Sequence, residues 1–293
     1  MDRSRPFIPV PAVSECALGR LKRTGSVSVH SSYRNTVNLK TDEGLIALQT
    51  AGSPRSPLSV ILPFDTAGMA ALAASAQRGI SVTADGSIVT EEAVLTADRA
   101  SGRTDVYSPA VPRTKTARVP QLHRLAQSIL TDAGPRGLAC LYGDGEGDLV
   151  TDAARSFLAK AREALSSGDQ EGSARALLRL LGLGGGLTPA GDDFLCGAAA
   201  ALTAFGKEDG AFGRSLLSGI REGLPRTNDI SAAFLACAAD GLASEAVTLF
   251  FSEEAAVSEE ELARKFLAIG HSSGTDSLCG IETVLSYLKE GSI

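Results

Sequence analysis

The sequence predicts an α+β protein in which a β-rich N-terminal domain, a barrel or sandwich, precedes a mostly α-helical C-terminal domain. Short alternating runs with many β-branched residues fill the first hundred or so of the 293 residues. From residue 120 onward, apolar residues recur at helical spacing instead. Between them, PAVPRTKTARVP at 109–120 has no apolar period and is typical of a linker. The predicted domains are 1–115 and 116–293.

The N-terminal domain is expected to consist of short strands with one helix, at 68–79, packed across them. Within segment 80–90, Asp85-Gly86 stands between two β-branched runs, which is a strong hairpin signal. The other expected strands cover residues 26–31, 36–41, 45–51, 58–63, 93–98 and 104–109. Several short strands separated by turn residues are typical of a sandwich or barrel.

The C-terminal domain is expected to be a helical assembly. Pro120 can open its first helix, because proline is tolerated in a helix's first turn. Segment 193–206 is apolar on all sides, so it should be the central buried helix. The other expected helices cover residues 148–168, 171–182, 212–223, 230–241, 257–270 and 277–290.

Charge and composition exclude several classes of protein. The net charge is −6, with +4 over residues 1–120 and −10 over 121–293. This balance argues against a nucleic-acid-binding protein, which needs a basic surface. Five cysteines without a C-x-x-C pair favour a reducing cytoplasm. We expect neither a signal peptide nor a membrane span, and no three-ligand zinc pattern is present in the sequence. His123, on an expected helix without ligand-spaced neighbours, is interpreted as structural.

The stretch GLGGGLTPAGDDFLCG at 182–197 is the most informative motif. It is neither a P-loop, which ends in Gly-Lys-Ser/Thr, nor a dinucleotide fingerprint, which follows a strand. One interpretation is structural: a glycine ends one helix, Thr188 is the N-cap of the next, and Asp192 and Asp193 match the helix dipole. The other is a ligand site, because capping does not explain all the glycines. Bare amides at a helix start bind anions, and acids beside them can hold a cation.

A second stretch, GHSSGTDSLCG at 270–280, repeats the pattern G-x-D-x-L-C-G of the first. The match favours Asp193 over Asp192 as the functional acid, with Asp276 as its partner. Together they could hold Mg²⁺ or a proton. His271 is either a surface residue or an acid or base beside the same site.

A third stretch, PRTNDISAAFLACAADG at 225–241, again places polar residues before an apolar helix. Arg226 is the only cation close by and could hold an anion with two hydrogen bonds. The full set of candidates follows from the three stretches. The candidate catalytic residues are Asp193, Asp192 and His271. The candidate ligand-binding residues are Gly184, Gly185, Gly186, Thr188, Gly191, Arg226, Thr227, Ser231, Ser272, Ser273, Gly274 and Asp276.

On these motifs the chain resembles the AllH-like family, long listed as a domain of unknown function. GLTPAGDDFLCG is similar to the family signature G-L-T-P-S/A-G-D-D-F-x-x-G, with Ala190 at the position where a serine is expected. The resemblance implies a subunit of oxamate carbamoyltransferase, an enzyme of allantoin breakdown that passes a carbamoyl group between oxalurate and phosphate. It further implies small anionic ligands (carbamoyl phosphate, oxamate, oxalurate or phosphate) and partner subunits of the FdrA and AllG kinds.

Three functions therefore remain open from the sequence. The first is a carbamoyl-transferring subunit. The second is a non-catalytic subunit that binds an anionic metabolite or assembles a complex. The third is a scaffold in which the glycines serve only close helix packing.

Overall fold

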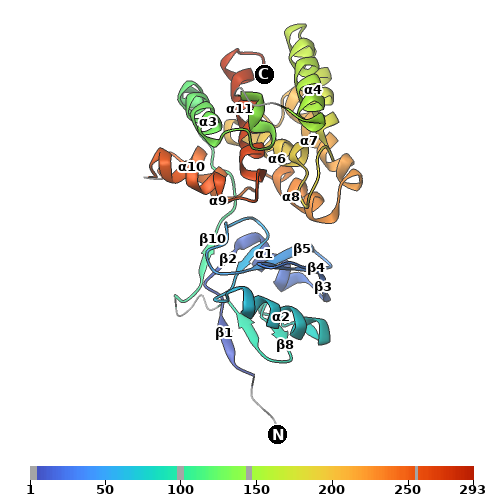
Figure 1. The fold of residues 1–293 in the computed structure, drawn as a ribbon, viewed down its shortest axis with the longest axis vertical. Coiled ribbons are helices and arrows are strands. Elements are labelled where there is room, and N and C mark those ends of the chain that lie inside the picture. The colour runs from blue at the N-terminus through green and yellow to red at the C-terminus, as the bar shows by residue number, and fades with distance from the viewer. Residues whose placement is uncertain (1–4, 98–101, 143–146, 255–256) are drawn as a thin grey trace. The chain divides into compact units, whose positions relative to one another are not determined.

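The computed structural model describes residues 5–97, 102–142, 147–254 and 257–293. Its chain divides into two compact units, 1–109 and 110–293. The first is β-rich and the second is mostly helical, which confirms the predicted fold class. In Figure 1 the β-rich unit is coloured blue to blue-green and the helical unit green to red.

Two sheets build the N-terminal unit, and its described residues form no closed barrel. One sheet has the strand order β1-β9-β8-β7 and the other β10-β2-β6-β5-β4-β3. Three pairs are parallel (β1 with β9, β2 with β10, β5 with β6) and the rest are antiparallel. The strands are β1 (Phe7–Pro9), β2 (Ala12–Ser14), β3 (Val27–Ser32), β4 (Thr36–Thr41), β5 (Gly44–Gln49), β6 (Ser59–Ile61), β7 (Ile80–Val82), β8 (Ile88–Thr90), β9 (Val94–Thr96) and β10 (Asp105–Tyr107).

Two helices accompany these sheets, α1 (Glu15–Arg23) and α2 (Thr66–Arg78). The expected helix at 68–79 corresponds to α2, whose N-cap Asp65 accepts the Gly68 N–H at 2.9 Å. The expected hairpin is confirmed, since β7 and β8 pair antiparallel around Gly86, whose φ of +87° suits glycine. The sequence did not indicate α1, β1 or β2.

The helical unit is organised around α6 and α11, which make the most extensive helix–helix contact in the unit. α3 and α10 pack against α11, and α7 and α8 against α6 (Figure 1). The α-helices are α3 (Val119–Ala133), α4 (Leu149–Ser166), α5 (Gln170–Leu177), α6 (Ala190–Phe205), α7 (Ala211–Gly223), α8 (Asp229–Ala239), α9 (Glu245–Phe251), α10 (Glu259–Leu267) and α11 (Ser273–Lys289). Short 3₁₀-helices are η1 (Thr116–Arg118), η2 (Gly137–Tyr142), η3 (Leu178–Leu180) and η4 (Leu224–Arg226).

The central position of the apolar segment 193–206 is confirmed. Nearly every side chain of α6 is buried, and most of those of α11 are as well. An apolar helix of this kind is stable in water only when other helices cover all its sides. Asp193 and Asp276, in the polar first turns of these two helices, are buried as well.

Candidate functional site

Two glycines let α6 and α11 touch backbone to backbone. A Cβ atom at Gly197 would lie 1.8 Å from the Ser277 carbonyl oxygen, and one at Gly280 would lie 1.9 Å from the Phe194 carbonyl oxygen. No side chain larger than hydrogen fits at such distances. The contacts join the fifth and eighth residues of the two helices, so the helices cross one to two turns from their beginnings.

The sequence repeat corresponds to a structural repeat. The Gly191 N–H donates to the Leu183 carbonyl at 2.9 Å, and the Gly274 N–H donates to the Ile269 carbonyl at 3.1 Å. Each glycine thus occupies the same place in its own loop-to-helix turn. The two carboxyl groups that follow by two residues, Asp193 and Asp276, therefore emerge from equivalent first turns.

Asp192 is fully used in holding the three stretches together. Its Oδ1 accepts the Gly182 N–H at 2.6 Å, and its Oδ2 accepts the hydroxyls of Thr227 at 2.5 Å and Ser231 at 2.6 Å. This buried carboxyl group links the glycine-rich loop to the start of α8. The hydroxyls of Thr227 and Ser231 are thereby engaged within the protein.

Asp193 and Asp276 differ from Asp192, because each has one oxygen without a donor. Asp276 Oδ1 accepts the Leu138 N–H at 2.6 Å, whereas its Oδ2 is buried and has no hydrogen-bond partner in the described part of the chain. The same is true of Asp193 Oδ2. The exposed fraction of Asp193 is 8% and that of Asp276 is 0%. A buried polar atom without a partner destabilises the fold by about 1–3 kcal/mol, so such a pair calls for an explanation.

Burial changes the proton affinity of both groups in the same direction. Burial raises the pKa of Asp193 well above its usual 3.8. The hydroxyls of Ser273 and Thr188 lower this pKa, and the charges of Asp276 and Asp192 raise it. Burial also raises the pKa of Asp276 to about 6, against the lowering effect of the Leu138 N–H and of Ser272. Both carboxyl groups therefore retain a proton to higher pH than aspartates in water.

The glycine-rich loop and the second motif meet through two hydroxyls. Thr188 Oγ1 and Ser273 Oγ are 2.9 Å apart and share a hydrogen bond. The prediction that Thr188 is the N-cap of the following helix is wrong. Pro189 occupies that position, with no side-chain cap, and α6 begins at Ala190. Proline's restricted φ suits the residue before the helix equally well, which frees the Thr188 side chain.

The loop itself is open. Gly184 has a φ of +117°, and a Cβ there would lie 2.8 Å from the Ala190 nitrogen, so only glycine fits. Gly185 and Gly186 are exposed, and a Cβ at either would meet no atom within 4 Å. Their N–H groups make no hydrogen bond to the residues that the structure describes. These are the unused amides that an anion could accept from.

The structure places the predicted site residues at different depths. Asp192, Asp193, Asp276, Gly191, Gly274 and Ser231 are buried, Gly184, Thr188, Thr227, Ser272 and Ser273 are partly buried, and Gly185, Gly186, Arg226 and His271 are exposed. Arg226 borders the loop, because its carbonyl oxygen lies 3.1 Å from a Cβ built at Gly182. Within residues 5–97, 102–142, 147–254 and 257–293, no group of three or more His, Cys, Asp or Glu could hold a metal ion. Mg²⁺ at Asp193 and Asp276 stays a prediction.

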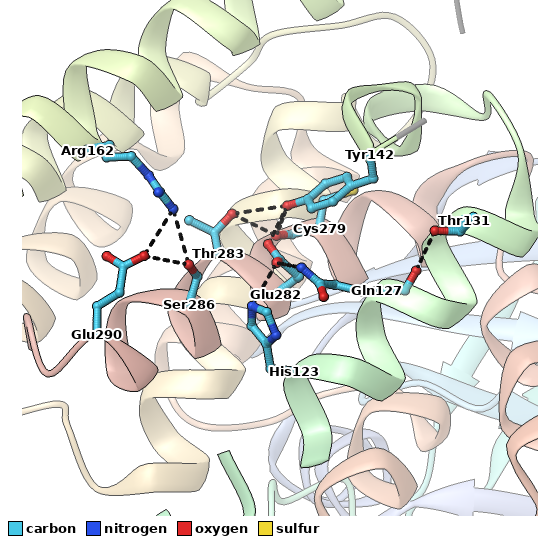
Figure 2. A network of polar contacts seen from close by, with 10 residues as sticks. All are labelled: His123, Gln127, Thr131, Tyr142, Arg162, Cys279, Glu282, Thr283, Ser286 and Glu290. Carbon is cyan, nitrogen blue, oxygen red and sulfur yellow. Dashed lines mark hydrogen bonds and ion pairs between the residues drawn. The ribbon is translucent and has the colours of Figure 1, made fainter. Parts of the chain in front are cut away.

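A buried polar network that the sequence did not indicate lies along the same helix α11 (Figure 2). The Glu282 carboxyl accepts the Tyr142 hydroxyl at 2.7 Å and the Gln127 amide at 3.1 Å, and His123 Nε2 is 3.3 Å away. Burial lowers the pKa of His123. Since Leu138 and Tyr142 both belong to η2, this short helix is attached to α11 at both ends. The one charged residue in the stretch 277–288 was the available signal for Glu282.

The described chain thus defines an α+β protein with paired, buried carboxyl groups where two equivalent helix starts meet. Two family models match it: residues 180–285 match the model described as oxamate carbamoyltransferase subunit AllH, and residues 11–102 match the AllH family N-terminal domain. The chain belongs to the AllH family. It accordingly has a subunit role in oxamate carbamoyltransferase, which implies partner subunits. No curated protein and no solved structure gave a significant match. Among the described helices, none has the length and apolar character needed to cross a membrane.

Proposed function

We propose that this chain holds the carbamoyl group during carbamoyl transfer between oxalurate and phosphate. The observation that supports this most directly is the pair of buried carboxyl oxygens without donors, Asp193 Oδ2 and Asp276 Oδ2. A carbamoyl nitrogen carries two N–H donors, and its carbonyl oxygen accepts. A hydrogen bond contributes about 0.5–1.5 kcal/mol, and about 1.5–3 kcal/mol when one partner is charged, so a carbamoyl group would satisfy what the folded chain leaves open.

The raised pKa values support a proton transfer at the same place. When a phosphate oxygen attacks the ureido carbonyl carbon of oxalurate, the bond from that carbon to the oxamate nitrogen breaks, and this nitrogen must take a proton. Asp193, whose pKa is raised well above its usual value, is our choice for the donor. Asp276 would then accept an N–H of the carbamoyl group. Catalysis would come mainly from positioning and charge stabilisation.

The anionic part of the ligand fits the open loop. The free amides of Gly185 and Gly186 precede α6 closely, and glycine-rich turns before a helix commonly bind phosphate or carboxylate. Arg226, an exposed residue whose backbone carbonyl borders the loop, could add a hydrogen-bonded charge pair. His271 would act as a second acid or base beside the same site. We further propose that the partner subunits are of the FdrA and AllG kinds.

The depth of the carboxyl groups favours one alternative. Asp276 is fully buried and Asp193 nearly so. The pair could therefore instead hold the local fold beneath a surface used for assembly, in a subunit without chemistry of its own. In that case, removal of the carboxyl groups would change complex formation rather than the rate of transfer.

Two experiments separate these functions. Calorimetric titration of the chain with carbamoyl phosphate, oxamate or phosphate, with and without Mg²⁺, tests for binding; no heat with any probe would favour a scaffold. Assay of the reconstituted complex then compares Asp193→Asn and Asp276→Asn with Asp209→Asn, a matched change at an exposed aspartate. We expect the first two to lose activity at least 100-fold with the complex intact. Full activity in both would refute the proposal.

A further inference from the structure

We propose that Tyr142 and Glu282 are positioning residues for Asp276, because they hold the far end of η2 on α11 and so keep the Leu138 N–H against the Asp276 carboxyl group. The inference deepens the proposed function and rests on it for the role of Asp276 in carbamoyl transfer. Its structural part, that η2 fixes the Asp276 carboxyl group, stands on the contacts of η2 alone.

η2 bridges two points of the same helix. Near its beginning, the Leu138 N–H donates to Asp276 Oδ1 at 2.6 Å. At its last residue, the Tyr142 hydroxyl donates to Glu282 Oε2 at 2.7 Å. Asp276 and Glu282 are six residues apart on α11, which corresponds to about 9 Å along the helix axis. A short segment attached over such a span therefore cannot shift at one end without straining the other.

Gly137 lets the backbone of η2 lie directly on the Asp276 carboxyl group. A Cβ at Gly137 would lie 2.8 Å from Asp276 Oδ2, closer still to Oδ1, and 2.8 Å from the Ser272 Cβ. The Gly137 φ of +53° also favours glycine. One side of the carboxyl group is thus covered by η2, so any movement of η2 changes both this cover and the backbone donor.

The far end of η2 is held by a fixed acceptor. Glu282 is 6% exposed, and its carboxyl group also accepts the Gln127 amide at 3.1 Å, with His123 Nε2 3.3 Å away (Figure 2). Both of these residues lie on α3, so Glu282 is held between α3, η2 and its own helix. Burial raises the pKa of Tyr142 well above its usual value of 10, so its hydroxyl keeps the proton that it donates.

A polar anchor at this place is better explained by positioning than by stability. Taking a carboxyl group out of water is costly even when it is paired, so buried groups of this kind are weak evidence for stability. A fully hydrogen-bonded network instead restricts its members to one arrangement. Catalytic groups need this restriction, since a misplacement of about 1 Å can lower a rate about 100-fold. Tyr142 and Glu282 thus supply precision to Asp276 rather than contact the ligand.

The first test is kinetic and uses the reconstituted complex. Tyr142→Phe removes only a hydroxyl and should lower kcat at least about 10-fold, with KM for phosphate changed by less than about twofold. KM should be kept because the proposed phosphate contacts, Gly185 and Gly186, lie on a different loop. Tyr287→Phe makes the same change at another buried tyrosine of α11 and should leave both constants unchanged. Circular dichroism verifies that the variants are folded.

A double-mutant cycle shows whether this loss acts through Asp276. In the Asp276→Asn background, the addition of Tyr142→Phe should change the residual kcat by less than about twofold, since the group to be positioned is already absent. A loss of about 10-fold in both backgrounds would overturn the inference, because Tyr142 would then act independently of Asp276.

Hydrogen exchange of the chain alone tests the structural part without any assay of activity. Tyr142→Phe should speed exchange of the Leu138 amide hydrogen at least about 10-fold, because η2 opens more often, whereas Tyr287→Phe should not. Unchanged exchange or unchanged kcat in Tyr142→Phe would overturn the inference even if Asp276→Asn is inactive. Full activity in Asp276→Asn would instead refute the proposed function, while faster exchange in Tyr142→Phe would still support the fixing of Asp276 by η2.

Discussion

Replacement of Asp276 by asparagine should stabilise the protein at neutral pH. The carboxyl group has a usual pKa of 3.8 and a pKa of about 6 in the folded protein, mainly because it is buried. The folded state therefore binds the proton more tightly than the unfolded state. This extra stability is complete below pH 3.8 and is lost as the pH rises through 6. The shift of about two pH units corresponds to about 3 kcal/mol.

Asparagine cannot ionise, but its carbonyl oxygen can still accept the Leu138 N–H that Asp276 accepts now. The unfolding free energy of Asp276→Asn minus that of the unmodified chain should therefore grow by about 2.4 kcal/mol between pH 4 and pH 7. Removal of the Asp276 charge also removes one cause of the raised Asp193 pKa, which acts in the same direction.

Urea unfolding between pH 4 and pH 8, followed by the helical circular dichroism signal, measures this difference. Asp209→Asn, at an exposed aspartate, is the control and should give a nearly flat difference. If the Asp276→Asn curve is equally flat, or if the variant becomes less stable as the pH rises, the assignment of Asp276 as a buried, unsatisfied carboxyl group is wrong.

Three further substitutions test the packing around the site. Asp192→Ala removes the acceptor of three hydrogen bonds and should destabilise the chain by about 4 kcal/mol or more. Thermal unfolding should show this as a fall in Tm of at least about 8 °C. A small change in Tm would mean that water replaces the carboxyl group. Gly280→Ala should destabilise by about 3 kcal/mol in urea unfolding, because its Cβ would lie 1.9 Å from the Phe194 carbonyl oxygen, whereas Gly185→Ala should be nearly neutral. Tyr142→Phe removes a 2.7 Å hydrogen bond to Glu282 and should lower the unfolding free energy by about 1.5–3 kcal/mol; equal stability would show that another donor takes its place.

Local sequence patterns predicted the elements that depend on local interactions. The expected strand at 36–41 has the same bounds as β4, and the Asp85-Gly86 turn is confirmed. β1 could not be found in this way, because its three residues pair in parallel with β9, and Phe7 faces Val94. Parallel partners so distant in sequence leave no short-range signal.

The same limit applies to the site. The repeated G-x-D-x-L-C-G pattern indicated that Asp193 and Asp276 are equivalent, and the structural repeat agrees with this. Two adjacent acids gave no local sign that Asp192 would be satisfied by Thr227 and Ser231 while Asp193 would not. Side chains of neighbouring helical residues diverge by about 100°, so their environments depend on tertiary packing.

The repeat also explains how a nearly symmetric framework can hold two unlike acids. Asp193 and Asp276 occupy equivalent turns, but among the residues that the structure describes only Asp276 receives a backbone donor, the Leu138 N–H of η2. Asp193 instead lies near the hydroxyls of Ser273 and Thr188 and near two other carboxyl groups. Since a hydrogen bond to the charged form lowers a pKa and a neighbouring like charge raises it, Asp193 should keep its proton after Asp276 has lost its own. One acid donor beside one acceptor is the arrangement that the proposed carbamoyl ligand, with its carbonyl oxygen and its amide nitrogen, would require.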